Sequence, residues 1–162
     1  MRTLRLITRA SALAAVVLLA GAQGARAQSA DQTKTEAAAQ AESSLYKRLS
    51  GYDALAAVSD EFLQRLGADK RLGRFVAGLS VDSQKKLRQR LVDFLCEKTG
   101  GPCVYTGRDM KTSHTGLRIT EEDWKAGADA LVATLDKFKV PQKERDEVVA
   151  LVMSLKGDIV GR

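Results

Sequence analysis

The chain has 162 residues, of which 28% are charged, and it contains two cysteines and a single histidine. Its formal net charge is +6, from 26 basic and 20 acidic residues, but four of the basic residues and none of the acids fall within the first 27 positions. The rest of the chain is close to neutral. This argues against a nucleic-acid partner, because nucleic acids bind to sustained basic stripes on a protein surface.

Residues 1–27 have the three parts of a secretory signal peptide. Three arginines, Arg2, Arg5 and Arg9, precede an apolar stretch at 12–22, and Ala25-Arg26-Ala27 follows as a cleavage motif. The apolar stretch is too short for a permanent membrane span. We therefore predict signal removal, export to the periplasm, and no stable membrane insertion of the mature chain. The alternative is an uncleaved amphipathic anchor.

Residues 28–43 are polar and rich in alanine, with no large apolar side chain. Such a segment cannot bury enough surface to offset the entropy lost on ordering, so we predict a flexible tether. Residues 44–162 have the length of one domain.

Within 44–162 apolar residues recur at helical spacing, and no run alternates with period two, so the sequence predicts an all-α domain. A short turn at 45–49 ends at Ser50-Gly51, and a helix is expected at about 53–66, followed by a brief helical stretch at 69–75. Ser80 or Asp82 can cap the next helix, which ends at Gly100-Gly101-Pro102. That helix includes the basic run at 85–90, which we interpret as a solvated face.

The pattern weakens between Cys103 and Gly116, which predicts a loop with at most a short helix around the histidine. Thr120, followed by three acids, predicts a helix start, and the helix behind it carries Trp124 and Phe138 at the two ends of its apolar face. Pro141 is expected to open one last helix, with a buried face that runs to Ile159.

The single histidine, His114, lies in this weakly patterned segment, RDMKTSHTGLRIT at 108–120. A group bound between helices would explain both the irregular chain and the isolated imidazole, because such groups replace side-chain packing. The alternative is an ordinary surface imidazole without chemistry.

The segment GGPCVYTGRDMKTSHTGLRIT at 100–120 resembles the region around the proximal histidine of the truncated haemoglobins, in particular their first group. The resemblance extends over 45–76 and 131–141 and so covers essentially the whole domain. It implies a two-over-two helical sandwich around haem b, with His114 as the iron ligand and a diatomic gas on the opposite face. It further implies apolar haem contacts by Phe62, Phe75, Phe94 and Met110, although each of these residues is equally well explained as core.

The side of the haem that would face the gas departs from the family pattern. Many relatives place a tyrosine after the phenylalanine of this helix, but Phe62 is followed by Leu63. Positions that often carry glutamine or another polar residue align with Leu87 and Leu91. Without a donor for oxygen, we expect fast gas exchange; tight oxygen storage and strong nitric oxide dioxygenase activity are not expected.

The remaining expectations concern the haem edge and the reaction class. Arg90 and Lys111 are candidates to pair with the haem propionates, although both are equally explained as surface charges. A gas-binding protein is favoured over a dedicated enzyme, with an unidentified reductase as a further partner. One histidine and no Gly-x-Ser-x-Gly turn exclude a visible hydrolase triad.

Cys96 and Cys103 lie seven residues apart around the Gly-Gly-Pro turn. In an oxidising compartment they either form a disulfide or remain two buried thiols. A zinc site that adds His114 lacks a fourth ligand. The rival to the haem hypothesis is a cofactor-free helical interaction protein of the cell envelope.

Overall fold

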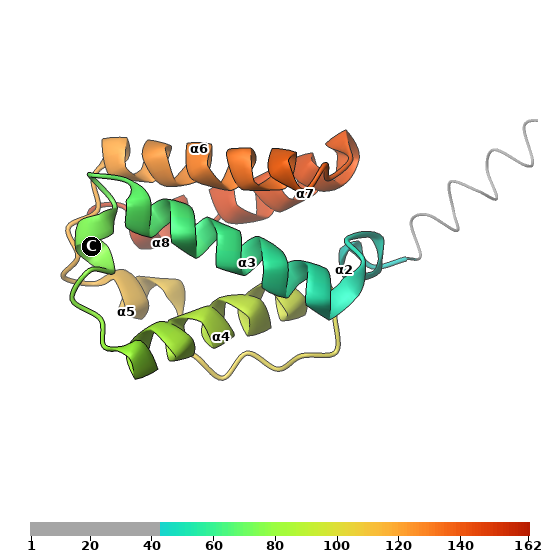
Figure 1. Cartoon of the computed structure of the whole chain (residues 1–162), viewed down its shortest axis with the longest axis horizontal. Helices are drawn as coiled ribbons and strands as arrows, with labels where there is room; N and C mark the ends of the chain where they lie inside the picture. Colours follow the sequence, from blue (N-terminus) through green and yellow to red (C-terminus); the bar gives the residue numbers. More distant parts are fainter. Residues whose placement is uncertain (1–42) are drawn as a thin grey trace, which may run out of the picture. The chain divides into compact units, whose positions relative to one another are not determined.

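The computed structural model describes residues 43–162 (Figure 1). The predicted signal peptide and the predicted tether up to residue 42 therefore lie outside the described residues. All regular elements from 43 to 162 are helical, which confirms the all-α prediction. They are α2 (Leu45–Arg48), α3 (Gly51–Ala68), the 3-10 turn η1 (Gly73–Phe75), α4 (Val81–Lys98), α5 (Met110–His114), α6 (Glu121–Lys137), α7 (Gln142–Met153) and α8 (Lys156–Ile159).

The helix starts follow from capping side chains. The Ser80 hydroxyl accepts a hydrogen bond from the Ser83 N–H at 3.2 Å and begins α4. At the start of α6, Thr120 accepts from the Asp123 N–H at 3.2 Å, and the Asp123 carboxylate accepts from the Thr120 N–H at 3.0 Å. This reciprocal pair satisfies two N–H groups that a helix end leaves unpaired. Both caps confirm the starts predicted from the sequence.

Several element boundaries differ from the prediction. The first long helix is longer than expected, and the stretch at 69–75 is helical only at η1, because the Asp69 carboxylate accepts from the N–H groups of Arg71 and Leu72 and forms a turn. The expected last helix is divided into α7 and α8 by Ser154 and Leu155. Phe138 was predicted to be buried, but it follows the last residue of α6 and is 41% exposed.

The long helices form two antiparallel pairs, α3 with α4 and α6 with α7. In Figure 1 the α6–α7 pair lies above the α3–α4 pair. Helix α3 also packs against α6 and so joins the two pairs. This arrangement is the two-over-two sandwich expected from the sequence.

The core is concentrated toward one end of the sandwich. One buried cluster comprises Leu55, Phe94, Leu95 and Cys96, and another comprises Val58, Leu131, Leu135 and Val148. Their α3 members come from its first half and their α4 members from its second half, and these two halves lie together at the right of Figure 1.

The other end of the α3–α4 pair is packed less completely. Phe62, Leu63 and Leu66 in the second half of α3 are only half-buried, and Leu87 in the first half of α4 is 37% exposed. Helix α5, which carries the histidine, lies at this end in Figure 1. Between residues 43 and 162, none of the helices has the length and apolarity that crossing a membrane requires.

Candidate cofactor site

His114 is the last residue of α5, a helix of five residues. The Asp109 carboxylate begins this helix, since one of its oxygens accepts from the Thr112 N–H at 2.6 Å and the other from the Thr112 hydroxyl at 3.0 Å. The hydrogen bond from the Thr112 N–H lowers the pKa of Asp109. A helix this short is unstable alone. Its cap and its packing must therefore hold the imidazole in place.

The imidazole of His114 is half-buried, and its Nδ1 lies 2.7 Å from the carbonyl oxygen of Met110. A carbonyl oxygen can only accept a hydrogen bond, so Nδ1 carries the proton. In the neutral ring Nε2 then keeps its lone pair. A histidine whose second nitrogen is fixed in this way is oriented as a metal ligand.

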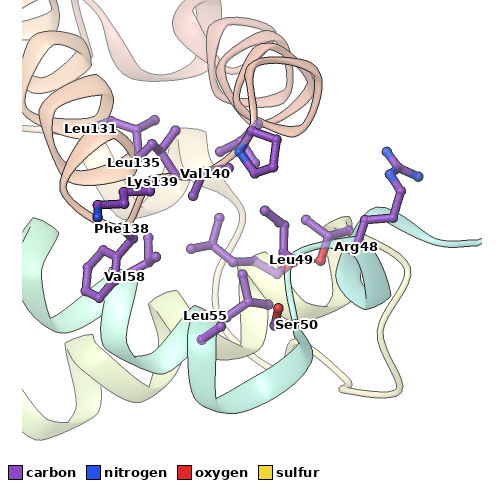
Figure 2. A pocket seen from close by; sticks show the side chains of 15 residues that line it. Arg48, Leu49, Ser50, Leu55, Val58, Leu131, Leu135, Phe138, Lys139 and Val140 are labelled. Atoms are coloured by element: carbon purple, nitrogen blue, oxygen red, sulfur yellow. Dashed lines mark hydrogen bonds between the residues drawn. The ribbon is translucent and has the colours of Figure 1, made fainter.

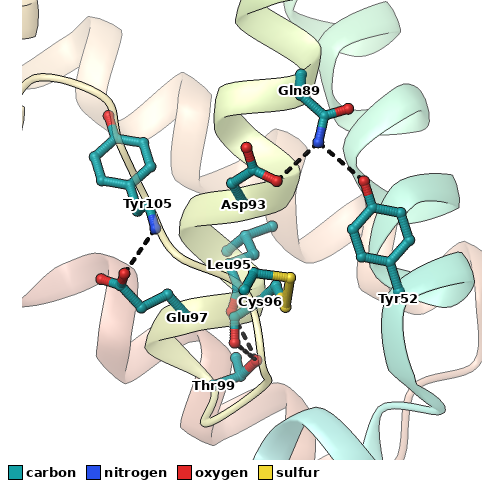
Figure 3. Close-up of a disulfide and its surroundings, with 9 residues drawn as sticks. Tyr52, Gln89, Asp93, Leu95, Cys96, Glu97, Thr99 and Tyr105 are labelled. Carbon is teal, nitrogen blue, oxygen red and sulfur yellow. Dashed lines mark hydrogen bonds between the residues drawn. A yellow bond between two sulfur atoms is a disulfide. The ribbon is translucent and has the colours of Figure 1, made fainter.

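On the N-terminal side, α5 is joined to α4 by a loop that the disulfide Cys96–Cys103 fastens to the end of α4 (Figure 3). The Tyr105 N–H donates to the Glu97 carboxylate at 2.7 Å, and this hydrogen bond lowers the pKa of Glu97. The Tyr105 ring meets Phe94 edge-on, with 5.3 Å between centroids. The loop that leads to the histidine is thus held by covalent, polar and aromatic contacts.

The disulfide settles the alternatives left open by the sequence. Cys96 and Cys103 pair with each other, so the hypothesis of two free thiols is wrong. A disulfide sulfur is not a thiolate ligand, so the zinc site with His114, already disfavoured by the lack of a fourth ligand, is also excluded. Among residues 43–162 there is no group of three or more His, Cys, Asp or Glu side chains that could hold a metal ion. An iron at His114 would need further ligands from a cofactor.

On the C-terminal side, the segment after α5 is held by the end of the chain. The Leu117 N–H donates to the His114 carbonyl at 3.1 Å. The Arg118 N–H donates to the carbonyl of Arg162 at 2.9 Å, and the Gly161 N–H donates to that of Ile119 at 2.9 Å. Helix α8 packs against α5, so both ends of the histidine helix are fixed to the scaffold.

The other predicted site residues lie mainly on α3, η1, α4 and α5. Leu63 and Phe75 are half-buried, and the Arg74 guanidinium lies 4.6 Å from the centroid of the Phe75 ring. Arg90 donates to the hydroxyl of Thr106, and Lys111 is exposed.

Three of the predicted contacts also pack against the core. Phe62 packs against the Val58 cluster, and Leu91 and Met110 pack against the Leu55 cluster. Phe94 is a member of the Leu55 cluster, which supports its interpretation as a core residue. The haem contacts of these residues stay predictions.

One feature that favours a cofactor was missed in the sequence. Gly127 is half-buried in the middle of α6, between Asp123 and Leu131, which are both buried on the same face one turn away on either side. A Cβ added to Gly127 would meet no atom within 4 Å, apart from its own helix backbone and chain neighbours. Glycine in a helix interior costs about 1 kcal/mol relative to alanine. A glycine in the middle of a predicted helix was therefore the signal that the sequence offered.

Three features of this end fit a flat apolar cofactor that brings its own iron ligands. They are a histidine with a free Nε2, half-buried apolar side chains, and open space beside Gly127. Together with the helical sandwich, these features define a haem-binding globin.

Comparison with known proteins identifies the family. Residues 44–160 match the family model of the bacterial-like globins, so the chain belongs to that family. It is 32% identical over 116 residues to the group 1 truncated haemoglobin GlbN of Mycolicibacterium paratuberculosis, a match that covers 72% of this chain and 83% of the relative. It is 30% identical over 120 residues to that of Nostoc commune, covering 74% and 99%.

Solved structures agree with this assignment. The Fe(III) form of the Tetrahymena pyriformis truncated haemoglobin superposes with a TM-score of 0.68 at 27% identity, covering 74% of this chain and all of that one, 100%. The Synechococcus 2/2 haemoglobin, solved in the cyanomet state with covalently attached haem, gives a TM-score of 0.67 at 31% identity and covers 74% and 100%. The chain is therefore a truncated haemoglobin of the first group, which binds haem b and a diatomic gas.

Proposed function

We propose that His114 is the proximal ligand of the haem, through Nε2, and that the protein binds a diatomic gas reversibly with fast exchange. The observation that carries the proposal is the hydrogen bond from His114 Nδ1 to the Met110 carbonyl, at 2.7 Å, which leaves Nε2 as the free donor of electrons. His114 would hold the haem, and the haem would supply an iron that can bind a diatomic gas. The chain's own residues position the ring and surround the gas.

The gas-facing side is proposed to be lined by Leu63, Leu87 and Leu91. None of these side chains can donate a hydrogen bond. A donor aimed at partly negative dioxygen would contribute on the order of 1 kcal/mol or more. Its absence favours rapid oxygen release, whereas carbon monoxide and nitric oxide depend less on a donor. Gas exchange or sensing therefore fits these residues better than tight oxygen storage.

Two cations are proposed for the propionate edge. Lys111 is exposed on α5, three residues before the histidine. Arg90 lies on α4, and its bond to Thr106 holds the guanidinium near the loop that leads to α5. A reductase that keeps the iron ferrous completes the proposed set of partners.

Export to the periplasm is part of the same proposal. The disulfide Cys96–Cys103 supports it, because such bonds persist in oxidising compartments and are rare in a reducing cytosol. Expression of the full-length chain in a Gram-negative host, followed by fractionation and mass spectrometry, tests it. We expect a periplasmic chain that begins at Gln28, and an uncleaved cytoplasmic chain would contradict it.

The ligand assignment is tested by absorption spectroscopy of the purified chain and of its His114→Ala variant after addition of hemin. We expect a strong Soret band for the parent chain and its loss or shift in the variant. Lys143→Ala is the control, because it removes an exposed side chain on α7 to which no role in haem binding is assigned, and it should keep the band. If His114→Ala leaves the spectrum unchanged, another residue binds the iron. If the folded parent stays colourless, the protein does not bind haem.

A further inference from the structure

A cavity lies away from the predicted haem contacts. It has a volume of about 300 Å³ and is lined by residues of α2, α3, α6 and α7 together with the end of α4 and the loop before α7 (Figure 2). Most of its walls are apolar, with Leu49, Leu55, Val58, Leu131 and Val140 among them. None of the nine residues predicted to contact haem or iron lines it.

The rim of this cavity carries two backbone conformations that ordinary side chains rarely adopt. Three non-glycine residues within 43–162 have positive φ, and two of them, Ser50 at 68° and Lys139 at 53°, line the cavity. Lys139 follows the last turn of α6, a position where glycine is usual. A positive φ at a residue other than glycine is uncommon, and such backbone conformations cluster at functional sites.

Only one of the two cations on the rim is engaged. Arg48 donates to Glu144 at 3.0 Å and also to Glu147. The ammonium of Lys139 has no hydrogen-bond or ion-pair partner among the described residues. Lys139 directly follows Phe138, which lines the same cavity and is 41% exposed (Figure 2). An uncompensated positive charge thus stands beside an apolar chamber with an exposed aromatic edge.

We propose that this cavity binds a small amphiphilic monocarboxylate, with its hydrocarbon part among the leucines and valines and its carboxylate paired with Lys139. The size is suitable, because an apolar void of about 150 Å³ binds benzene, and this cavity has about twice that volume. The carboxylate would meet the one unpaired cation of the rim. This site goes beyond the proposed gas binding and does not require haem.

The experiment titrates the purified protein with sodium octanoate and, separately, with 1-octanol, which has the same chain without the charge. Amide chemical-shift mapping by NMR locates the site, and the Soret band reports separately on the haem. We expect octanoate to shift amides around Leu49, Val58 and Val140 while the Soret band stays unchanged. Shifts confined to the His114 region, or none at all, would overturn the proposal.

Two variants test the parts of the site. Lys139→Gly removes the ammonium and suits a positive φ, so it should fold at least as well as the parent. We expect octanoate affinity to fall at least tenfold and 1-octanol affinity to stay the same, with Lys85→Gln as an exposed-lysine control. Equal octanoate affinity in Lys139→Gly and the parent would refute carboxylate recognition. Ala54→Leu, which fills the chamber from α3, should weaken both ligands.

Discussion

Leu63 is predicted to face the bound gas, and this prediction is open to a direct test. It follows Phe62 in the half-buried second half of α3. We expect Leu63→Tyr to add a phenolic donor and to slow oxygen dissociation roughly tenfold, since about 1.4 kcal/mol corresponds to a factor of ten. Stopped-flow mixing of the oxygenated protein with carbon monoxide measures this rate.

Leu63→Phe is the matched control, because it has the same ring without the hydroxyl. Oxygen dissociation should stay fast in this variant, and carbon monoxide binding should change little in either one. A slow oxygen off-rate in the parent chain would show that some other residue donates a hydrogen bond to the gas, since Leu63, Leu87 and Leu91 cannot.

At the scale of single elements, the stability of α5 depends on the charge of the Asp109 carboxylate. The pKa of Asp109 lies below its ordinary value of 3.8, because its carboxylate accepts from the Thr112 N–H. A lowered folded-state pKa means that its stabilising contribution is present above the ordinary pKa and is lost as the pH falls through the lowered value. We therefore expect the parent to be more stable than Asp109→Asn at pH 7, with the difference shrinking below pH 3.8.

Urea unfolding of both chains at neutral and acid pH measures this difference. Asparagine keeps a capping oxygen but does not titrate, so the comparison isolates the charge. A gap between the two chains that is independent of pH would show that the Asp109 carboxylate does not stabilise α5 through its charge.

The disulfide Cys96–Cys103 stabilises the loop before α5. Closing a loop of seven residues removes entropy from the unfolded chain, and the cross-link contributes about 2 kcal/mol on this account. For a domain of this size we expect the Cys96→Ala/Cys103→Ala double variant to melt roughly 8 °C below the parent. Thermal unfolding followed by circular dichroism checks this, and equal melting temperatures would show that the noncovalent loop contacts suffice.

Some features of these elements could be predicted from the sequence, and others could not. The helices, the caps at Ser80 and Thr120, and the short helix at His114 were predictable, because they depend on local spacing and on capping side chains. The break between α7 and α8 and the exposure of Phe138 were not, because both depend on how the chain packs beyond α6. The disulfide was left open, since a spacing of seven does not fix the distance between two sulfurs. Gly127 carried a signal that was available but unused.

At the scale of the whole molecule, haem would complete a core whose two buried clusters lie toward one end. The buried clusters join the first half of α3 and the second half of α4 to α6 and α7, whereas α5, η1 and the first half of α4 contribute no member. Removal of haem should therefore loosen the His114 end and spare the other, because ligand binding to the folded state stabilises the elements that it contacts.

Hydrogen–deuterium exchange of the haem-loaded and haem-free protein tests this expectation. We expect faster exchange without haem at α5, η1 and 81–90, and nearly unchanged exchange at α6 around Leu131 and Leu135, which lie in a cluster of protein side chains alone. The two ends of α4 provide an internal comparison, since Val92 and Leu95 are buried and Leu87 is not. Uniform loosening along α4 would mean that the haem supports the whole sandwich, and no change at α5 would place the haem elsewhere.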